Sequence, residues 1–223
     1  MLGVLMLDTR FPRIVGDIGH PHTFDFPVRH EVVHGASPQR VVRERDLSLL
    51  QPFVAAGESL VRSGASAITT SCGFLVLFQR ELQEALPVPV WTSSLLLLPQ
   101  IQATLPAGCK VGVVTVDAAA LSAELLRAAG ADASTPVEGL APGCAFQRTL
   151  LNDEVWFDVD AAKQATVEAA LRLVERRPDV AAIVLECTNM PPYAEAVRAA
   201  TGRAVHDITT LINSRYGLGE RAS

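Results

Sequence analysis

The chain of 223 residues carries little charge, and no part of it is strongly basic. Only 19% of the residues are charged, and the formal net charge is −5. Nucleic acids and anionic membranes attract surfaces rich in Lys and Arg, so this composition gives no reason to expect either partner. Nearly half of the residues, 49%, are apolar, which indicates a compact globular protein with a sizeable core.

Long hydrophobic runs and paired cysteines are also missing. No segment reaches the roughly 18 uninterrupted apolar residues of a membrane helix. The first residues, MLGVLMLDTRF, have no basic start and are interrupted by Asp8 and Arg10, a pattern that favours a strand over a signal peptide. The four cysteines include no CxxC pair, which argues against a zinc site and favours free thiols in a reducing compartment. We expect a soluble cytoplasmic protein, and its oligomeric state stays open.

Short apolar segments rich in β-branched residues alternate with helix-like stretches. Such segments are typical of strands buried on both faces of a parallel sheet, and the alternation predicts βαβ units and an α/β fold. The expected strands are Gly3–Leu7, Ala65–Thr70, Val88–Trp91, Lys110–Val116, Val180–Leu185 and Ala204–His206. The expected helices are Arg43–Ser63, Asp117–Ala129 and Asp160–Arg176.

The two halves of the chain repeat each other in the order of their elements. GVLMLD at Gly3–Asp8 corresponds to GVVTVD at Gly112–Asp117, and each half then continues with a strand, a cysteine, a helix, a short strand and a helix. We therefore predict two pseudo-symmetric βα lobes with mainly parallel sheets and an active site in the cleft between them; one continuous doubly wound sheet is the alternative. The predicted first lobe is residues 1–98 with 207–223, and the predicted second lobe is residues 99–206.

In each lobe a buried strand runs directly into a cysteine, at Cys72 in SAITTSCGFL and at Cys187 in AAIVLECTNM. Ligands bind outside the carboxyl ends of parallel strands, and a helix start is expected to lower the pKa of a thiol toward thiolate. Two thiols that face each other across a cleft suit the inversion of a stereocentre, which needs a base on one face of a carbon and an acid on the other. Packing is the alternative role for each cysteine, and it is the role we expect for Cys109 and Cys144.

In the motifs TTSCGF and ECTNMPPY the chain resembles the cofactor-independent aspartate/glutamate/hydantoin racemase superfamily, whose members have two α/β lobes with a catalytic cysteine in each. The resemblance implies an isomerase that inverts the α-carbon of a small amino acid or a hydantoin, with Cys72 and Cys187 as catalytic residues and without a cofactor or metal. Glutamate racemases have Asn-Thr after the first cysteine and Thr-His after the second. Only Thr188 matches here, which argues against glutamate racemase proper.

The resemblance and the positions at strand ends together predict a set of substrate-binding residues: Asp8, Ser71, Gly73, Phe74, Thr115, Thr188 and Asn189. Asp8 would orient a thiol or a substrate amine, Thr115 would bind the substrate carboxylate, and capping of turns is the alternative for both. The expected partner is a small carboxylate or a hydantoin. A second carboxylate has no evident counter-charge except Arg10 or Arg13.

The segment Thr9–Gln39 has no counterpart in the second lobe that the sequence makes recognisable, and we expect a lid or specificity loop. Its histidines His20 and His22, with Asp17, are more typical of a solvent-facing loop than of a metal site.

Two more functions stay open. Relatives include maleate isomerases, in which a cysteine adds covalently to the substrate, and arylmalonate decarboxylases, which keep only one of the two cysteine positions. The presence of both cysteines argues against decarboxylation. A non-catalytic homologue that binds a small ligand is the remaining possibility.

Overall fold

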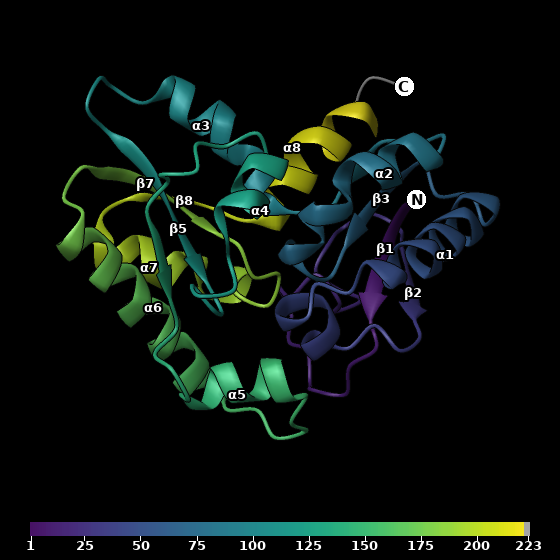
Figure 1. Cartoon of the computed structure of the whole chain (residues 1–223), viewed down its shortest axis with the longest axis horizontal. Coiled ribbons are helices and arrows are strands. Elements are labelled where there is room, and N and C mark those ends of the chain that lie inside the picture. The colour runs from purple at the N-terminus through teal and green to yellow at the C-terminus, as the bar shows by residue number, and fades with distance from the viewer. Residues whose placement is uncertain (221–223) are drawn as a thin grey trace.

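Two four-stranded parallel sheets, one in each half of the chain, form the framework of the molecule (Figure 1). The computed structural model describes residues 1–220. The first sheet has the order β2-β1-β3-β4 and the second β6-β5-β7-β8, so the predicted α/β fold of two similar lobes is confirmed. The strands are β1 (Leu2–Leu7), β2 (Val28–Val33), β3 (Ala67–Thr70), β4 (Val90–Trp91), β5 (Lys110–Thr115), β6 (Val137–Gly139), β7 (Val180–Leu185) and β8 (Ala204–His206).

The central strands of both sheets are buried, as is typical of parallel sheets. Every residue of β1 and β3 is buried, and so are nearly all residues of β5 and β7. Strands β1 and β3 pair in parallel with Leu5 opposite Thr70, so their carboxyl ends reach the same edge of the sheet. This edge carries the residues discussed below as a candidate site.

Eight α-helices surround the sheets within the described residues. They are α1 (Leu50–Arg62), α2 (Gln79–Ala85), α3 (Leu98–Thr104), α4 (Ala123–Ala128), α5 (Ala145–Asn152), α6 (Val159–Arg176), α7 (Ala194–Thr201) and α8 (Ile208–Glu220). Shorter helical turns are the π-helix η1 (Gln39–Arg43) and the 3-10 helices η2 (Leu47–Leu49), η3 (Gly73–Phe78), η4 (Ser94–Leu97) and η5 (Pro191–Tyr193). No helix in this part of the chain has the length and apolar character to span a membrane.

Two of the expected helices start later than their sequence pattern predicts. Helix α1 begins at Leu50 instead of Arg43, because Arg45 adopts a left-handed backbone conformation (φ 50°) that breaks the helical path. Helix α4 begins at Ala123, because the Asp117 carboxylate accepts the N–H groups of the next turn and closes it locally.

The expectation that residues 9–39 lack a counterpart in the second lobe is wrong. This segment contains β2, which pairs with β1 in the same position in which β6 pairs with β5. Both are edge strands with partly exposed polar residues, so neither has the apolar run that makes a central strand recognisable.

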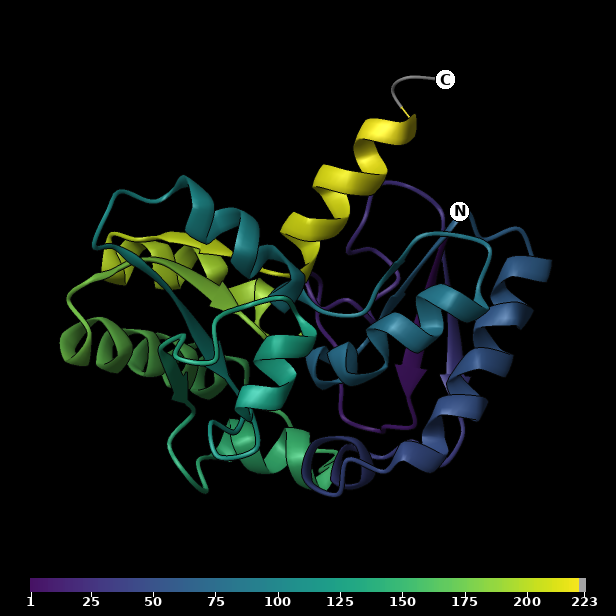
Figure 2. The same cartoon turned by 45° about the horizontal axis from the view of Figure 1, so that its top comes forward.

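Helix α8 lies where the two lobes meet (Figure 2). It contacts β8 and η4, and its Tyr216 ring lies 4.9 Å from the Phe26 ring of the first lobe. The contacts with η4 and Phe26 are with the first lobe and the contact with β8 is with the second, so the assignment of residues 207–223 to the first lobe stays a prediction. Residues 221–223 lie outside the described residues.

Candidate active site

The two cysteines predicted to be catalytic line one pocket between the lobes. Cys72 follows β3 and lies at the start of η3, and Cys187 follows β7. Both are buried, with 9% and 8% of their surface exposed. The lining residues are Leu7, Phe11, Arg13, Pro38, Val42, Ser71, Cys72, Gly73, Phe74, Val116, Leu150, Leu151, Glu186, Cys187, Thr188 and Asn189.

The residues predicted to bind substrate fall into two groups. Five of them line the pocket: Ser71, Gly73, Phe74, Thr188 and Asn189. Asp8 lies outside this lining, where its exposed carboxylate accepts the N–H of Gly35 at 3.0 Å. Thr115 is fully buried and donates its hydroxyl to a carboxylate of the pocket wall.

That carboxylate belongs to Glu186, which is not among the site residues predicted from the sequence. Its side chain is 1% exposed, and Thr115 Oγ1 donates to its Oε2 at 2.7 Å. Its Oε1 has no hydrogen-bond partner among the described residues. Burial raises the pKa of Glu186 to about 7, although the hydrogen bond from Thr115 acts in the opposite direction. The sequence signal that could have identified Glu186 is a charged residue directly before a cysteine at the end of a buried strand.

Gly73 makes room for this carboxylate. A Cβ atom at position 73 would overlap with Glu186 Oε1 and lie 2.5 Å from the Glu186 backbone oxygen. Glu186 is therefore packed directly against the backbone that follows Cys72. A glycine after the first cysteine and a glutamate before the second are sterically complementary.

The prediction that the helix starts lower the thiol pKa values is wrong. The pKa of Cys72 is raised to about 12, chiefly by burial and then by the negative charge of Glu186, and the N–H groups of Phe74 and Leu75 only partly offset this. The pKa of Cys187 is also raised, by burial and by Glu186. At neutral pH both groups are neutral thiols in the ligand-free protein.

A chain of polar contacts runs from Cys187 to the loop after β1. Cys187 Sγ donates to Asn189 Oδ1 at 3.4 Å, and Asn189 Nδ2 donates to Asp17 Oδ2. Asp17 also pairs with Arg13 at 2.9 Å. Both Arg13 and Asn189 therefore bind the Asp17 carboxylate. Residues 1–220 contain no group of three His, Cys, Asp or Glu arranged to hold a metal ion.

The pocket is narrow around its polar groups. About 30 Å³ of it is wide enough for water, which is room for about two water molecules. Val42 of η1 and Leu150 of α5 form part of its wall, and η1 and α5 are in contact; Figure 2 shows them side by side at the edge of the molecule.

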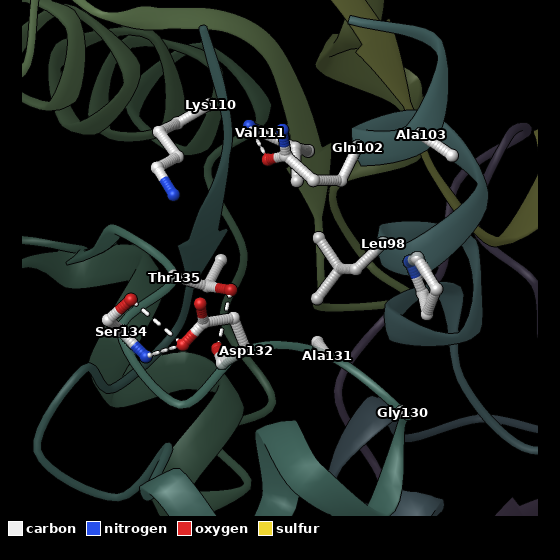
Figure 3. Close-up of a pocket in the computed structure, with 11 residues that line it drawn as sticks. Leu98, Gln102, Ala103, Lys110, Val111, Gly130, Ala131, Asp132, Ser134 and Thr135 are labelled. Atoms are coloured by element: carbon white, nitrogen blue, oxygen red, sulfur yellow. Dashed lines mark hydrogen bonds between the residues drawn. The ribbon is translucent and has the colours of Figure 1, made fainter. Parts of the chain in front are cut away.

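A larger hollow lies elsewhere, between α3 and the loop after α4 (Figure 3). Its volume is about 300 Å³, and several of its polar side chains bond to neighbouring residues. Gln102 binds the backbone of Cys109 and Val111, and Asp132 accepts from Ser134. None of its lining residues is a cysteine, so the candidate site is the smaller pocket.

The sequence and fold of the chain define its family. The chain matches the Asp/Glu/Hydantoin racemase family over residues 36–213 and belongs to this family of enzymes. It is 30% identical over 238 residues to a dimethylsulfoniopropionate lyase from Durusdinium sp. clade D, covering 98% of this chain and 78% of that protein. It is 33% identical over 227 residues to dimethylsulfoniopropionate lyase 7 from Emiliania huxleyi (strain CCMP1516), covering 96% of this chain but only 65% of that protein.

Solved structures share the two-lobe fold. Unliganded arylmalonate decarboxylase superimposes with a TM-score of 0.58 at 17% identity, covering 92% of this chain and 86% of that one. A glutamate racemase from Bacillus anthracis gives a TM-score of 0.57 at 18% identity, covering 92% of this chain and 75% of the other. At such identities the likeness establishes the fold and leaves the reaction open.

Proposed function

We propose that the chain is a cofactor-independent lyase that eliminates a sulfonium group from the β-carbon of a small carboxylate, with 3-dimethylsulfoniopropionate as substrate. The observation that carries this proposal is the pocket with two thiols in a chain 33% identical, over 96% of its length, to a dimethylsulfoniopropionate lyase. We also propose that the protein is located in the cytoplasm.

The reaction requires one base beside the α-carbon. The base takes the α-proton, and the electrons of that C–H bond form the double bond between the α- and β-carbons. The bond from the β-carbon to sulfur breaks, and dimethyl sulfide leaves with the electron pair of that bond. The organic product is acrylate, and the proton stays on the base until solvent removes it.

We assign the base to Cys187. Its Sγ is held by Asn189, which is in turn fixed by Asp17, so the thiol has a defined orientation toward the pocket. Before elimination, the Cys187 thiol releases its proton to solvent. The positive charge of a bound sulfonium favours the resulting thiolate and acts against burial, which raises the pKa of Cys187.

Racemisation is the second candidate, because both thiols line the same pocket from opposite lobes. Two-base inversion needs Cys72 and Cys187 equally, whereas elimination needs one base only. Two further functions are compatible with the same pair of thiols: an isomerase in which a cysteine adds covalently to maleate, and a protein that binds a ligand without turnover.

Proton NMR in heavy water separates these reactions. The protein is incubated with 3-dimethylsulfoniopropionate, with each enantiomer of aspartate and glutamate, and with 5-substituted hydantoins. We expect dimethyl sulfide and acrylate from the first compound. Cys187→Ala should lower the rate about 100-fold or more, the usual contribution of a general base, while Cys109→Ala leaves it unchanged.

Each competing reaction has its own signature in this experiment. Exchange of the α-proton of an amino acid or hydantoin, abolished or made one-sided by both Cys72→Ala and Cys187→Ala, would replace the lyase with a racemase. A mass adduct after incubation with maleate would indicate isomerase chemistry. Ligand binding that survives both cysteine-to-serine replacements, without turnover, would indicate a binding protein.

A further inference from the structure

We propose that Glu186 selects substrates with a cationic end: its buried, unbalanced carboxylate recognises a sulfonium or quaternary ammonium group in the pocket. This inference rests on the proposed function and names the feature of the substrate that the site recognises, which is its positive charge. It assigns specificity to a residue outside the cysteine pair.

The charges around the pocket support this assignment. Arg13 is the only Lys or Arg among the described residues that line it, and its charge is balanced by Asp17 at 2.9 Å. The two cysteines are neutral thiols at neutral pH, since burial raises the pKa of each. An ionised Glu186 is then the one lining group whose charge has no counter-ion within the described part of the chain.

Glu186 is also held in place by its surroundings. Thr115 occupies Oε2, and the backbone at Gly73 packs against Oε1, which has no hydrogen-bond partner among residues 1–220. A buried carboxylate without a counter-charge is costly, and Coulomb interactions are strong where water is excluded. A cation that enters the pocket offsets this cost, whereas a neutral group of the same size does not.

A matched pair of probes isolates the charge. The trimethylammonium compound 3-(trimethylammonio)propionate and its carbon isostere 4,4-dimethylpentanoate have the same shape and differ only in the positive charge. Ammonium is a poor leaving group, so binding is measured without turnover. Isothermal titration calorimetry at pH 8 should show that the protein binds the cationic probe about tenfold or more tightly than the neutral one.

Glu186→Gln is the decisive variant, because glutamine keeps the shape of the side chain and removes its charge. We expect the preference for the cationic probe to disappear in this variant and to persist in Glu168→Gln, a control on the exposed face of α6. Equal affinities for the two probes in the natural protein, or a preference that survives Glu186→Gln, would overturn the inference.

Thr115→Val provides a second, independent variant. It removes the hydrogen bond that lowers the pKa of Glu186, so the cation preference should weaken at pH 7 and return at higher pH. The titratable groups facing Glu186 from the neighbouring elements are Cys72 and Cys187, and Arg13 is the charged group in the same lining. An unchanged preference at pH 7 in Thr115→Val would count against Glu186 as its source.

The binding experiment and the lyase experiment can refute the two proposals independently of each other. If 3-dimethylsulfoniopropionate is not cleaved but the cation preference depends on Glu186, the specificity stands and the reaction is different. If the compound is cleaved but the preference persists in Glu186→Gln, the lyase stands and the role of Glu186 is refuted.

Discussion

Glu186 is a buried carboxyl group that lines the same pocket as two thiols, and its protonation affects both. Its negative charge raises the pKa of Cys72 and of Cys187. The three groups therefore titrate as a coupled set, in which the first proton to leave on raising the pH is that of Glu186, whose pKa is about 7.

This raised pKa predicts a pH-dependent stability. The pKa of Glu186 rises from 4.5 to about 7 on folding, so between these values the unfolded chain has lost a proton that the folded protein still holds. The free energy of unfolding then falls as the pH rises through this window, by on the order of 3 kcal/mol. Thermal unfolding should show that Glu186→Gln gains stability relative to the natural protein between pH 5 and pH 8; parallel curves would contradict it.

Gly73 allows a prediction that depends on packing alone. In Gly73→Ala the new methyl group meets the side-chain and backbone oxygens of Glu186, and the backbone oxygen cannot rotate away. We expect a loss of about 1–3 kcal/mol in the free energy of unfolding together with a loss of activity. Adding Glu186→Ala should restore only part of the stability, because the backbone oxygen remains; full recovery in urea unfolding would show that the side chain alone is responsible.

At the level of helices and strands, side-chain caps set boundaries that hydrophobic spacing misses. Helix α6 begins after Asp158, whose carboxylate accepts the N–H of Ala161 at 3.0 Å. Asp160, in the first turn, makes no such cap bond within residues 1–220, and its charge is favourable beside the helix N-terminus. The sequence pattern predicts the helix start at Asp160, two residues beyond the cap.

The two aspartates make a matched pair for testing the cap. Asp158→Ala removes a hydrogen-bonded cap, which costs about 1 kcal/mol, or roughly 2–4 °C in melting temperature for a chain of this size. Asp160→Ala removes only a favourable charge and should cost less than half as much. Equal shifts for the two variants in a thermal melt would contradict the assignment of Asp158 as the cap.

Across the whole molecule, the lobes are joined at the pocket edge by Asp153. This residue ends α5 in a left-handed conformation (φ 55°). Its carboxylate accepts the backbone N–H groups of Arg10 and Phe11 and pairs with the Arg10 side chain at 3.0 Å. The contact ties the second lobe to the loop that follows β1, close to Phe11 and Arg13 of the pocket lining.

We predict that the backbone contacts of Asp153 matter more than its ion pair. Asp153→Asn tolerates the left-handed backbone and keeps an oxygen for the two N–H groups, so only the exposed ion pair is lost, a change of less than about 1 kcal/mol. Asp153→Ala also leaves the N–H groups without their acceptor and should cost more. Hydrogen exchange at Arg10 and Phe11 should be faster in the alanine variant alone; faster exchange in both would assign the contact to the ion pair.

Local sequence patterns were sufficient to predict most of the framework. Uninterrupted apolar runs identify β1, β5 and β7 because central strands are buried on both faces, and the repeated order of elements identifies two lobes. The same patterns place Cys72 and Cys187 at strand ends. They miss β2, which lies at the sheet edge and has polar residues.

The electrostatics of the pocket depend on contacts between distant parts of the chain. Thr115 reaches Glu186 across 71 residues, and Asn189 reaches Asp17 across 172. Burial outweighs the N–H groups beside Cys72, so its pKa rises where local sequence predicts a decrease. The sequence determines where the thiols lie, because Cys72 follows β3 and Cys187 follows β7 along the chain. Their protonation and the unbalanced charge beside them arise only when folding removes water and brings the two lobes together.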